Sequence, residues 1–308
     1  MLVKESAVQY LLLIGLLFGF TVQAKTITHE MGVLELTKTP FKIVALDWVL
    51  AESLLSLGVT PYAVADSDGY NQWVVKPQLP SQVKNVGSRR EPNLERLTQL
   101  KPDLILMSSH LSPLYPSLQT IAPTMVLTVY NEKRDPFNQA KKILNQLAIV
   151  TTKENIAAQL ISEAEQYIQN NGSRLKKAGK AARPFFLVRF IGNKHIRIHG
   201  EYSLAGQTLT MMGLTNAWQG TANMWGFASA SMDKLALSQQ ANVLYFGPLN
   251  KTNKAKIFST PLWRAMTFTR QKRVYELPPI WAFGGINAAV RLSDTLTDAL
   301  LTAKSITK

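Results

Sequence analysis

Aromatic side chains in short loop segments are the feature of this sequence best suited to binding chemistry. They stand beside Gly, Asn and Pro rather than inside apolar runs, so less hydrophobic core is available to them. Aromatic rings offer a large contact area at a low cost in conformational entropy, which suits the wall of a binding cleft. Taken singly, each ring could equally fill the core or cap an element. Together they predict one wall of an exposed concave site, formed by Trp73, Trp218, Trp225, Trp281 and Phe283.

Arg89 is the polar residue best placed to join such a site. It lies in the segment GSRREPN at residues 87–93, between a strand-like stretch and the start of a helix. A guanidinium group can place several fixed donors on clustered oxygens, which is what a metal complex of hard oxygen ligands presents. The alternative is a surface ion pair with Glu91 or Glu95.

Signatures of enzymatic chemistry are scarce. The sequence lacks a Gly-x-Ser-x-Gly elbow, a His-Glu-x-x-His pair and a phosphate-binding Gly-x-x-x-x-Gly-Lys loop. Of its four histidines only His195 and His199 are close, and on a strand they would lie roughly 13 Å apart, too far to share an ion. We therefore expect no catalytic residue, no protein-bound metal and no resident cofactor. An exported hydrolase remains the alternative from another class, although its nucleophile, base and orienting group cannot be assembled.

The elements that must position these residues alternate between strands and helices. Apolar runs at residues 43–46 and 104–107 read as buried strands, and residues 48–57, ended by Gly58, read as a helix. Strands separated by helices imply parallel pairing through right-handed crossovers. The alternation resumes after Pro184.

A long amphipathic region separates the two alternating parts. Residues 153–177 carry apolar side chains at helical spacing, and a helix of about 25 residues would be about 37 Å long. The fold class that follows is α/β, with two α/β lobes joined by a single long backbone helix and a ligand cleft between the lobes. We assign residues 25–150 to the N-terminal lobe, 151–180 to the connecting helix and 181–308 to the C-terminal lobe.

A weak internal repeat relates the two lobes. NLERL at residues 93–97 and SMDKL at residues 231–235 each begin with a helix-capping residue and precede an apolar strand. Glu95 and Asp233 stand two positions after the cap, where a helix dipole favours negative charge. Capping explains this placement, and a shared docking role for the two carboxylates is the sharper hypothesis.

The N-terminus carries the pattern of a secretory signal peptide. Lys4 precedes an apolar run at residues 10–20 and a small-residue exit at Ala24. The run is shorter than the roughly 20 residues needed to span a bilayer, although a retained anchor is the alternative. We expect a signal peptide at residues 1–24, cleavage after Ala24 and a free periplasmic protein. The absence of cysteine excludes disulfides and a lipid anchor at the cleavage point.

The net charge of +14 could suggest a nucleic-acid partner. Export argues against such a partner, and the basic residues are scattered along the sequence. Their densest group, at residues 174–183, lies at the expected end of a helix, where a solvated cationic face is usual. A basic patch that attracts an anionic ligand is the alternative. We expect a monomer that binds no nucleic acid.

From about Pro40 to Leu301 the chain resembles the periplasmic ferric hydroxamate siderophore-binding proteins, a branch of the helical-backbone class of ABC-transporter solute-binding proteins. The resemblance is carried by VALDW at residues 44–48, VGSRREPNLE at 86–95, NAWQG at 216–220 with Asn223 and WG at 225–226, and TPLW at 260–263. It implies two lobes joined by one long helix, and a siderophore that supplies all the iron ligands. The protein would read the outside of the complex, with Arg89 on the hydroxamate oxygens and Trp73, Trp218, Trp225 and Trp281 as the wall.

Two departures from the family pattern concern the choice of siderophore. Leu111 stands where the family commonly has a tyrosine, with Tyr115 offset by four residues, and Phe283 replaces a second tyrosine. The resemblance further implies that Glu95 and Asp233 meet arginines of an inner-membrane permease, which works with its ATPase. A catecholate siderophore, haem or a corrinoid is the alternative ligand. A catecholate complex would call for several convergent basic residues, whereas only Arg89 and Arg90 are expected near the cleft.

Overall fold

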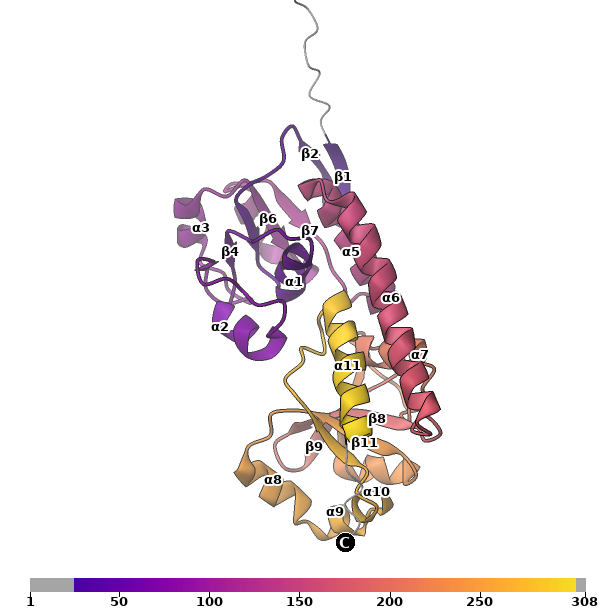
Figure 1. Ribbon diagram of the computed structural model, residues 1–308. Coiled ribbons are helices and arrows are strands. Elements are labelled where there is room, and N and C mark those ends of the chain that lie inside the picture. The colour runs from indigo at the N-terminus through magenta and orange to yellow at the C-terminus, as the bar shows by residue number, and fades with distance from the viewer. Residues whose placement is uncertain (1–24, 303–308) are drawn as a thin grey trace, which may run out of the picture.

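The computed structural model describes residues 25–302. The predicted signal peptide, with its cleavage point after Ala24, lies outside the described residues. Among the helices of the described part, none is long and apolar enough to cross a membrane. The described chain forms two sheet-containing lobes, one above the other in Figure 1, with long helices along one side.

The N-terminal lobe is built on a five-stranded parallel sheet in the order β5-β4-β3-β6-β7. Its central strands are buried on both faces, as expected for a parallel sheet covered by helices. A separate hairpin, β1–β2, packs Ile27 and Leu34 into the lobe's core, and sequence reasoning did not predict it. The elements are β1 (Lys25–His29), β2 (Gly32–Leu36), β3 (Ile43–Ala45), α1 (Trp48–Ser56), β4 (Ala63–Val64), α2 (Ser67–Gly69), η1 (Tyr70–Val74), β5 (Lys84–Asn85), α3 (Leu94–Leu100), β6 (Leu104–Met107), η2 (Ser109–Leu114), α4 (Tyr115–Gln119) and β7 (Thr124–Val126).

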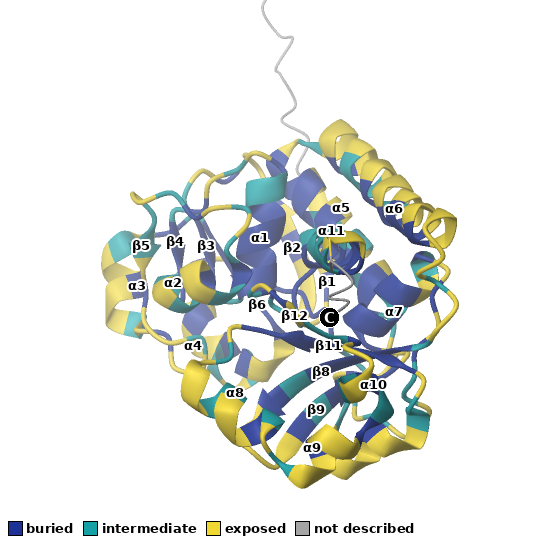
Figure 2. Cartoon of the chain, turned by 60° about the horizontal axis from the view of Figure 1, so that its bottom comes forward, coloured by how far each residue is buried: buried dark blue, intermediate teal, exposed yellow. Residues whose placement is uncertain are grey.

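The C-terminal lobe carries a mixed five-stranded sheet in the order β10-β9-β8-β11-β12. Strands β8, β11 and β12 run parallel, whereas β9 and β10 pair antiparallel at one edge. Figure 2 shows buried strands and exposed outer faces on the helices that cover this lobe. The elements are β8 (Phe185–Ile191), β9 (His195–His199), α7 (Leu204–Met211), β10 (Phe227–Ser231), η3 (Met232–Ser238), β11 (Asn242–Phe246), α8 (Lys251–Phe258), α9 (Pro261–Ala265), α10 (Thr267–Arg270) and β12 (Val274–Leu277).

Helix α6 (Glu154–Lys177) connects the lobes as predicted and runs along both of them in Figure 1. Ala157 and Ala164 pack into the core of the N-terminal lobe, and Ile168 and Leu175 into a core cluster of the C-terminal lobe. One continuous helix therefore belongs to both cores, which confirms the predicted fold class. At about 1.5 Å per residue, its 24 residues extend about 36 Å.

Two further helices strengthen this connection. Helix α5 (Pro136–Thr151) precedes α6 and is separated from it by Thr152 and Lys153, of which Thr152 adopts a left-handed φ of 58°. Helix α11 (Ile286–Thr302) packs along α6 and also contributes to both cores, through Ile286 in one and Leu292 in the other. Helix α11 is therefore a second helix that packs against both lobes, in addition to the connecting helix α6.

Candidate ligand-binding cleft

A cleft of about 540 Å³ lies between the lobes and takes its lining from both. Its N-terminal wall is formed where parallel strands end, because the segments after the carboxyl ends of such strands meet at one edge of the sheet. Asp47 follows β3, Arg89 follows β5, His110 follows β6 and Tyr130 follows β7. The C-terminal part of the chain contributes Arg197, Met224, Trp225, Phe227, Trp281 and Phe283, and of these Trp281 and Phe283 pack against the core of the N-terminal lobe.

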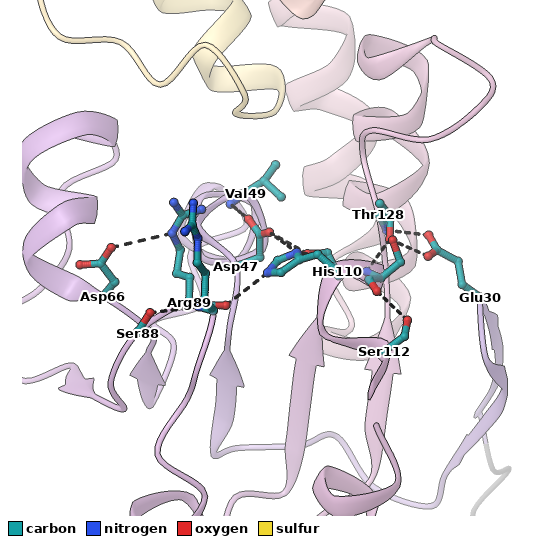
Figure 3. Close-up of polar contacts among 12 residues, drawn as sticks. Glu30, Asp47, Val49, Asp66, Ser88, Arg89, His110, Ser112 and Thr128 are labelled. Carbon is teal, nitrogen blue, oxygen red and sulfur yellow. Dashed lines mark hydrogen bonds and ion pairs between the residues drawn. The ribbon is translucent and has the colours of Figure 1, made fainter. Parts of the chain in front are cut away.

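Arg89 is held in place by aromatic rings rather than by hydrogen bonds. Its guanidinium carbon lies 3.7 Å from the centroid of the Trp48 ring and 5.0 Å from that of Trp281. Its ion pair is a long one, 3.8 Å from Nε to Asp66, and not the pair with Glu91 or Glu95 that sequence analysis kept open (Figure 3). Burial lowers the pKa of Arg89, although the negative charges of Asp47 and Asp66 act in the opposite direction. Stacked rings thus fix a cation whose terminal donors can reach ligand oxygens.

Asp47, Ser108 and His110 form a hydrogen-bonded brace, and Figure 3 shows Asp47 and His110 beside Arg89. Asp47 caps α1 by accepting from the Val49 N–H, and it also accepts from the Ser108 hydroxyl at 2.7 Å. The Nδ1 atom of His110 lies 2.7 Å from the same hydroxyl oxygen, and Nε2 lies 3.2 Å from the Arg89 carbonyl oxygen. The brace ties the segments that follow β3, β5 and β6 into one rigid wall.

A second polar link joins the β1–β2 hairpin to this wall. Glu30 accepts from both the backbone N–H and the hydroxyl of Thr128, each at 2.6 Å. The Thr128 hydroxyl oxygen accepts in turn from the Ser109 N–H at 2.9 Å. The hairpin is therefore linked to the segment that follows β7, and Figure 3 shows Glu30 beside Thr128.

Phe283 is the centre of the aromatic side of the cleft. Its ring centroid lies 5.4 Å from Trp281, 5.8 Å from Trp225 and 5.8 Å from Tyr130. Tyr130 belongs to the N-terminal lobe, and its hydroxyl donates to the carbonyl oxygens of Ala282 and Gly284. The cluster therefore forms a floor shared by both lobes.

Replacing Phe283 with alanine is expected to lower the free energy of unfolding by about 2–3 kcal/mol, because the ring contacts both lobes and the vacated space cannot close fully. Tyr202, whose exposed fraction is 54%, provides the control, and Tyr202→Ala should cost less than about 0.5 kcal/mol. Chemical denaturation followed by circular dichroism measures both. Equal losses for the two variants would contradict a central packing role for Phe283.

Four residues expected at the site do not line the cleft. Trp73 lies on η1, where its ring stacks under the guanidinium of Arg189 from the other lobe at 4.2 Å. Trp218 packs against the outer core cluster of the C-terminal lobe. Leu111 and Tyr115 are buried in the core of the N-terminal lobe, with exposed fractions of 3% and 9%.

The turn of η2 explains the position of Leu111. In this short helix Ser109 and His110 face the cleft while the next residue points inward. His110 therefore occupies the cleft near the position at which the resemblance places a tyrosine. Besides His110, sequence reasoning missed Asp47, Ser108, Tyr130, Arg197 and Phe227.

A buried carboxylate lies behind the aromatic floor. Glu52 on α1 is 1% exposed, and it accepts from the N–H groups of Gly285 at 3.4 Å and Ala288 at 3.1 Å, at the start of α11. Burial raises the pKa of Glu52 to about 7, although these N–H groups act in the opposite direction. The carboxyl group thus links α1 to the helix that follows the Trp281 segment.

The raised pKa of Glu52 predicts a pH-dependent stability. Between about pH 4.5 and 7 the folded state holds a proton that the unfolded state has lost, so the free energy of unfolding falls as pH rises through this window. Relative to Glu52→Gln, the wild type should lose about 3 kcal/mol across it. Urea unfolding at several pH values tests this, with the exposed Glu163→Gln as a control of unchanged profile. Parallel profiles for wild type and Glu52→Gln would refute it.

Glu95 and Asp233 are both exposed and lie outside the cleft lining. Glu95 stands in the first turn of α3, whose cap Asn93 accepts from the Arg96 N–H. Asp233 stands in the first turn of η3, a 3-10 helix rather than the expected α-helix. Hydrogen bonding to Ser231 lowers the pKa of Asp233. Each lobe therefore presents one exposed carboxylate in the first turn of a helix.

Two α/β lobes, a shared long helix and a cleft lined from both sides define a solute-binding protein. The chain belongs to the periplasmic binding protein family, whose profile matches residues 43–280. It is 36% identical over 261 residues to the iron(3+)-hydroxamate-binding protein FhuD of Escherichia coli K12, covering 85% of this chain and 87% of that protein. It is also 30% identical to the Fe(3+) dicitrate-binding periplasmic protein FecB of the same organism, covering 88% of each.

Solved structures agree with this assignment. The siderophore-binding protein FhuD of Vibrio cholerae, solved with Fe3+–Desferal, superposes with a TM-score of 0.81 at 31% identity, covering 85% of this chain and 98% of that one. The iron-uptake substrate-binding protein PiuA of Streptococcus pneumoniae superposes with a TM-score of 0.73, and at 20% identity it shows the fold alone. The recognised family and the fold class predicted from sequence are therefore confirmed.

Proposed function

We propose that this protein is the periplasmic solute-binding component of an ABC importer, that it carries an iron(III) siderophore of the hydroxamate type, and that it delivers this ligand to an inner-membrane permease. The observation that carries the proposal is the charged, ring-supported Arg89 at the mouth of an aromatic cleft. The E. coli relative named for iron(3+)-hydroxamate and the V. cholerae relative solved with Fe3+–Desferal support this ligand class.

The cleft suits a ligand that brings its own iron donors. Within residues 25–302, no group of three or more His, Cys, Asp or Glu side chains could hold a metal ion. A hydroxamate siderophore surrounds iron(III) with its own oxygens and presents those oxygens and an apolar rim to the protein. Arg89 would donate to the oxygens, and Trp225, Trp281 and Phe283 would cover the rim.

The protein acts as a carrier and not as an enzyme. The cleft does hold a serine, a histidine and an aspartate, but their geometry differs from a hydrolytic triad, in which the histidine stands between the other two. Here the Ser108 hydroxyl donates directly to Asp47, and the Nε2 atom of His110 faces the Arg89 carbonyl oxygen. This arrangement suits rigidity better than proton transfer.

Delivery needs a contact that both lobes share. Glu95 and Asp233 offer one exposed carboxylate on each lobe, and we assign them to contacts with basic side chains of the permease. The rigid connection through α6 and α11 keeps the two carboxylates in a fixed relation.

Tryptophan fluorescence tests the proposed ligand class, because Trp225 and Trp281 line the cleft. The mature protein is titrated in parallel with ferrichrome, ferrioxamine, ferric aerobactin and ferric enterobactin. Saturable quenching by one or more of the three hydroxamates is expected. Quenching by the catecholate enterobactin alone would overturn the ligand class, and no response to any of the four would turn attention to haem and corrinoids.

A further inference from the structure

Two arginines of the C-terminal lobe stand directly opposite each other on neighbouring strands. Arg189 on β8 pairs with Arg197 on antiparallel β9, so both side chains leave the same face of the sheet. Like charges in this position destabilise a strand pair. None of the ion pairs among the described residues includes either arginine. Each guanidinium lies over an aromatic ring instead, Arg189 over Trp73 and Arg197 over Phe227.

The surroundings of this pair add no negative charge. Burial lowers the pKa of Arg189, and the nearby charge of Arg197 lowers it further. His199, on the same face of β9, has a pKa lowered to about 3 by burial and by the same two arginines, so its imidazole is neutral. The fold therefore holds two cations together without a counter-ion from the described part of the chain.

One member of the pair reaches the cleft. Arg197 lines it, and so do Arg89 and Arg90 from the other lobe. Among the lining residues Asp47 is the sole carboxylate, and its oxygens already accept from Val49 and Ser108. Three guanidinium groups thus line a cleft whose one carboxylate, Asp47, already accepts hydrogen bonds from the protein.

A ferric complex of three hydroxamates has no net charge, because the three anionic groups balance iron(III). Such a ligand would leave the arginine pair unmatched. We propose that Arg197, with Arg189 behind it, forms an anion subsite that takes a free carboxylate of the siderophore. The preferred ligand is then a carboxylate-bearing ferric hydroxamate. This inference rests on the proposed function and names the substrate class within it. A planar guanidinium matches a carboxylate through two parallel hydrogen bonds.

Paired ligands test the subsite. Ferric aerobactin combines hydroxamates with free carboxylates, whereas ferrichrome is a neutral hydroxamate complex. We expect Arg197→Gln to weaken aerobactin binding by about tenfold or more and to change ferrichrome binding by less than about twofold. Arg270, an exposed arginine of the same lobe, supplies the matched control, and Arg270→Gln should change neither affinity. Isothermal titration calorimetry measures all six combinations.

The outcomes separate the inference from the proposed function. Binding of ferrichrome but not aerobactin to the wild type, or an equal effect of Arg197→Gln on both ligands, would overturn the subsite and leave the proposed function standing. Binding of neither ligand to the wild type would overturn both. A second measurement needs no variant: raising salt from 50 to 500 mM should weaken aerobactin binding several-fold and ferrichrome binding little. Equal salt dependence for the two ligands would also overturn the subsite.

Discussion

Replacing Arg89 with alanine is expected to weaken the binding of a ferric hydroxamate by about 1.5–3 kcal/mol, which corresponds to about 10- to 100-fold in affinity. The effect is large because the guanidinium is already oriented by Trp48 and Trp281, so little conformational entropy is lost when it donates to the ligand. Its side chain is 25% exposed, and its donors therefore act in a partly desolvated place. Fluorescence titration of both proteins with the same ligand measures the loss.

Two further variants make this result specific. Arg89→Lys keeps the charge but removes the planar fork of donors, so its affinity should fall between those of the wild type and Arg89→Ala. Arg96→Ala removes an exposed arginine of the same lobe and should leave affinity unchanged. If Arg89→Ala also binds like the wild type, then Arg89 serves only its ion pair with Asp66, and a pair this exposed and this long contributes little.

The two-lobed fold could be predicted from the sequence because the patterns that indicate its strands and its long helix are local. Buried strands such as β3 and β6 appear as uninterrupted apolar runs, and α6 appears as a long amphipathic period without a strand. The second bridge, α11, was not recognised as one. Its amphipathic pattern shows that one face is buried, but it does not identify the elements that cover this face. Its contacts with both cores are made by residues far away in the sequence and arise only in the folded chain.

The site was predictable only in part, for a related reason. Trp225, Trp281 and Phe283 stand in loops and do line the cleft, but so does Tyr130, which follows a buried strand. The rule that sites form at the carboxyl ends of parallel strands could have found Tyr130, because β7 ends just before it. Trp218 shows the limit of the loop criterion, since a loop can fold its ring back onto a core cluster.

Arg197 illustrates a signal that was present but unused. It stands between Ile196 and Ile198, both fully buried, so the alternation of the strand places it on the other face of the sheet. Its position opposite Arg189 depends on the register of an antiparallel pair. That register depends on how two strands pair, and it cannot be predicted from the alternation of residues within one strand.

Reversing both proposed docking carboxylates, with Glu95→Lys and Asp233→Lys, is expected to reduce siderophore uptake to background while ligand affinity stays within about twofold of the wild type. Uptake should be lost because two attractive contacts with basic permease side chains become repulsive. Affinity should persist because both residues are exposed and neither lines the cleft. Accumulation of radioactive iron from its ferric hydroxamate, in cells that rely on this protein, measures the first quantity, and fluorescence titration measures the second.

The matched control is a double reversal elsewhere, Glu35→Lys with Glu132→Lys, which changes net charge equally at exposed positions and should leave uptake intact. Single reversals make the argument sharper. Since α6 and α11 hold the two lobes in a fixed orientation, the contact made by one carboxylate raises the effective concentration of the other carboxylate at the permease. Each single variant should therefore lose well over half of the uptake, although the opposite lobe remains unchanged. Normal uptake by the double variant would show that the carboxylates only stabilise the first turns of their helices.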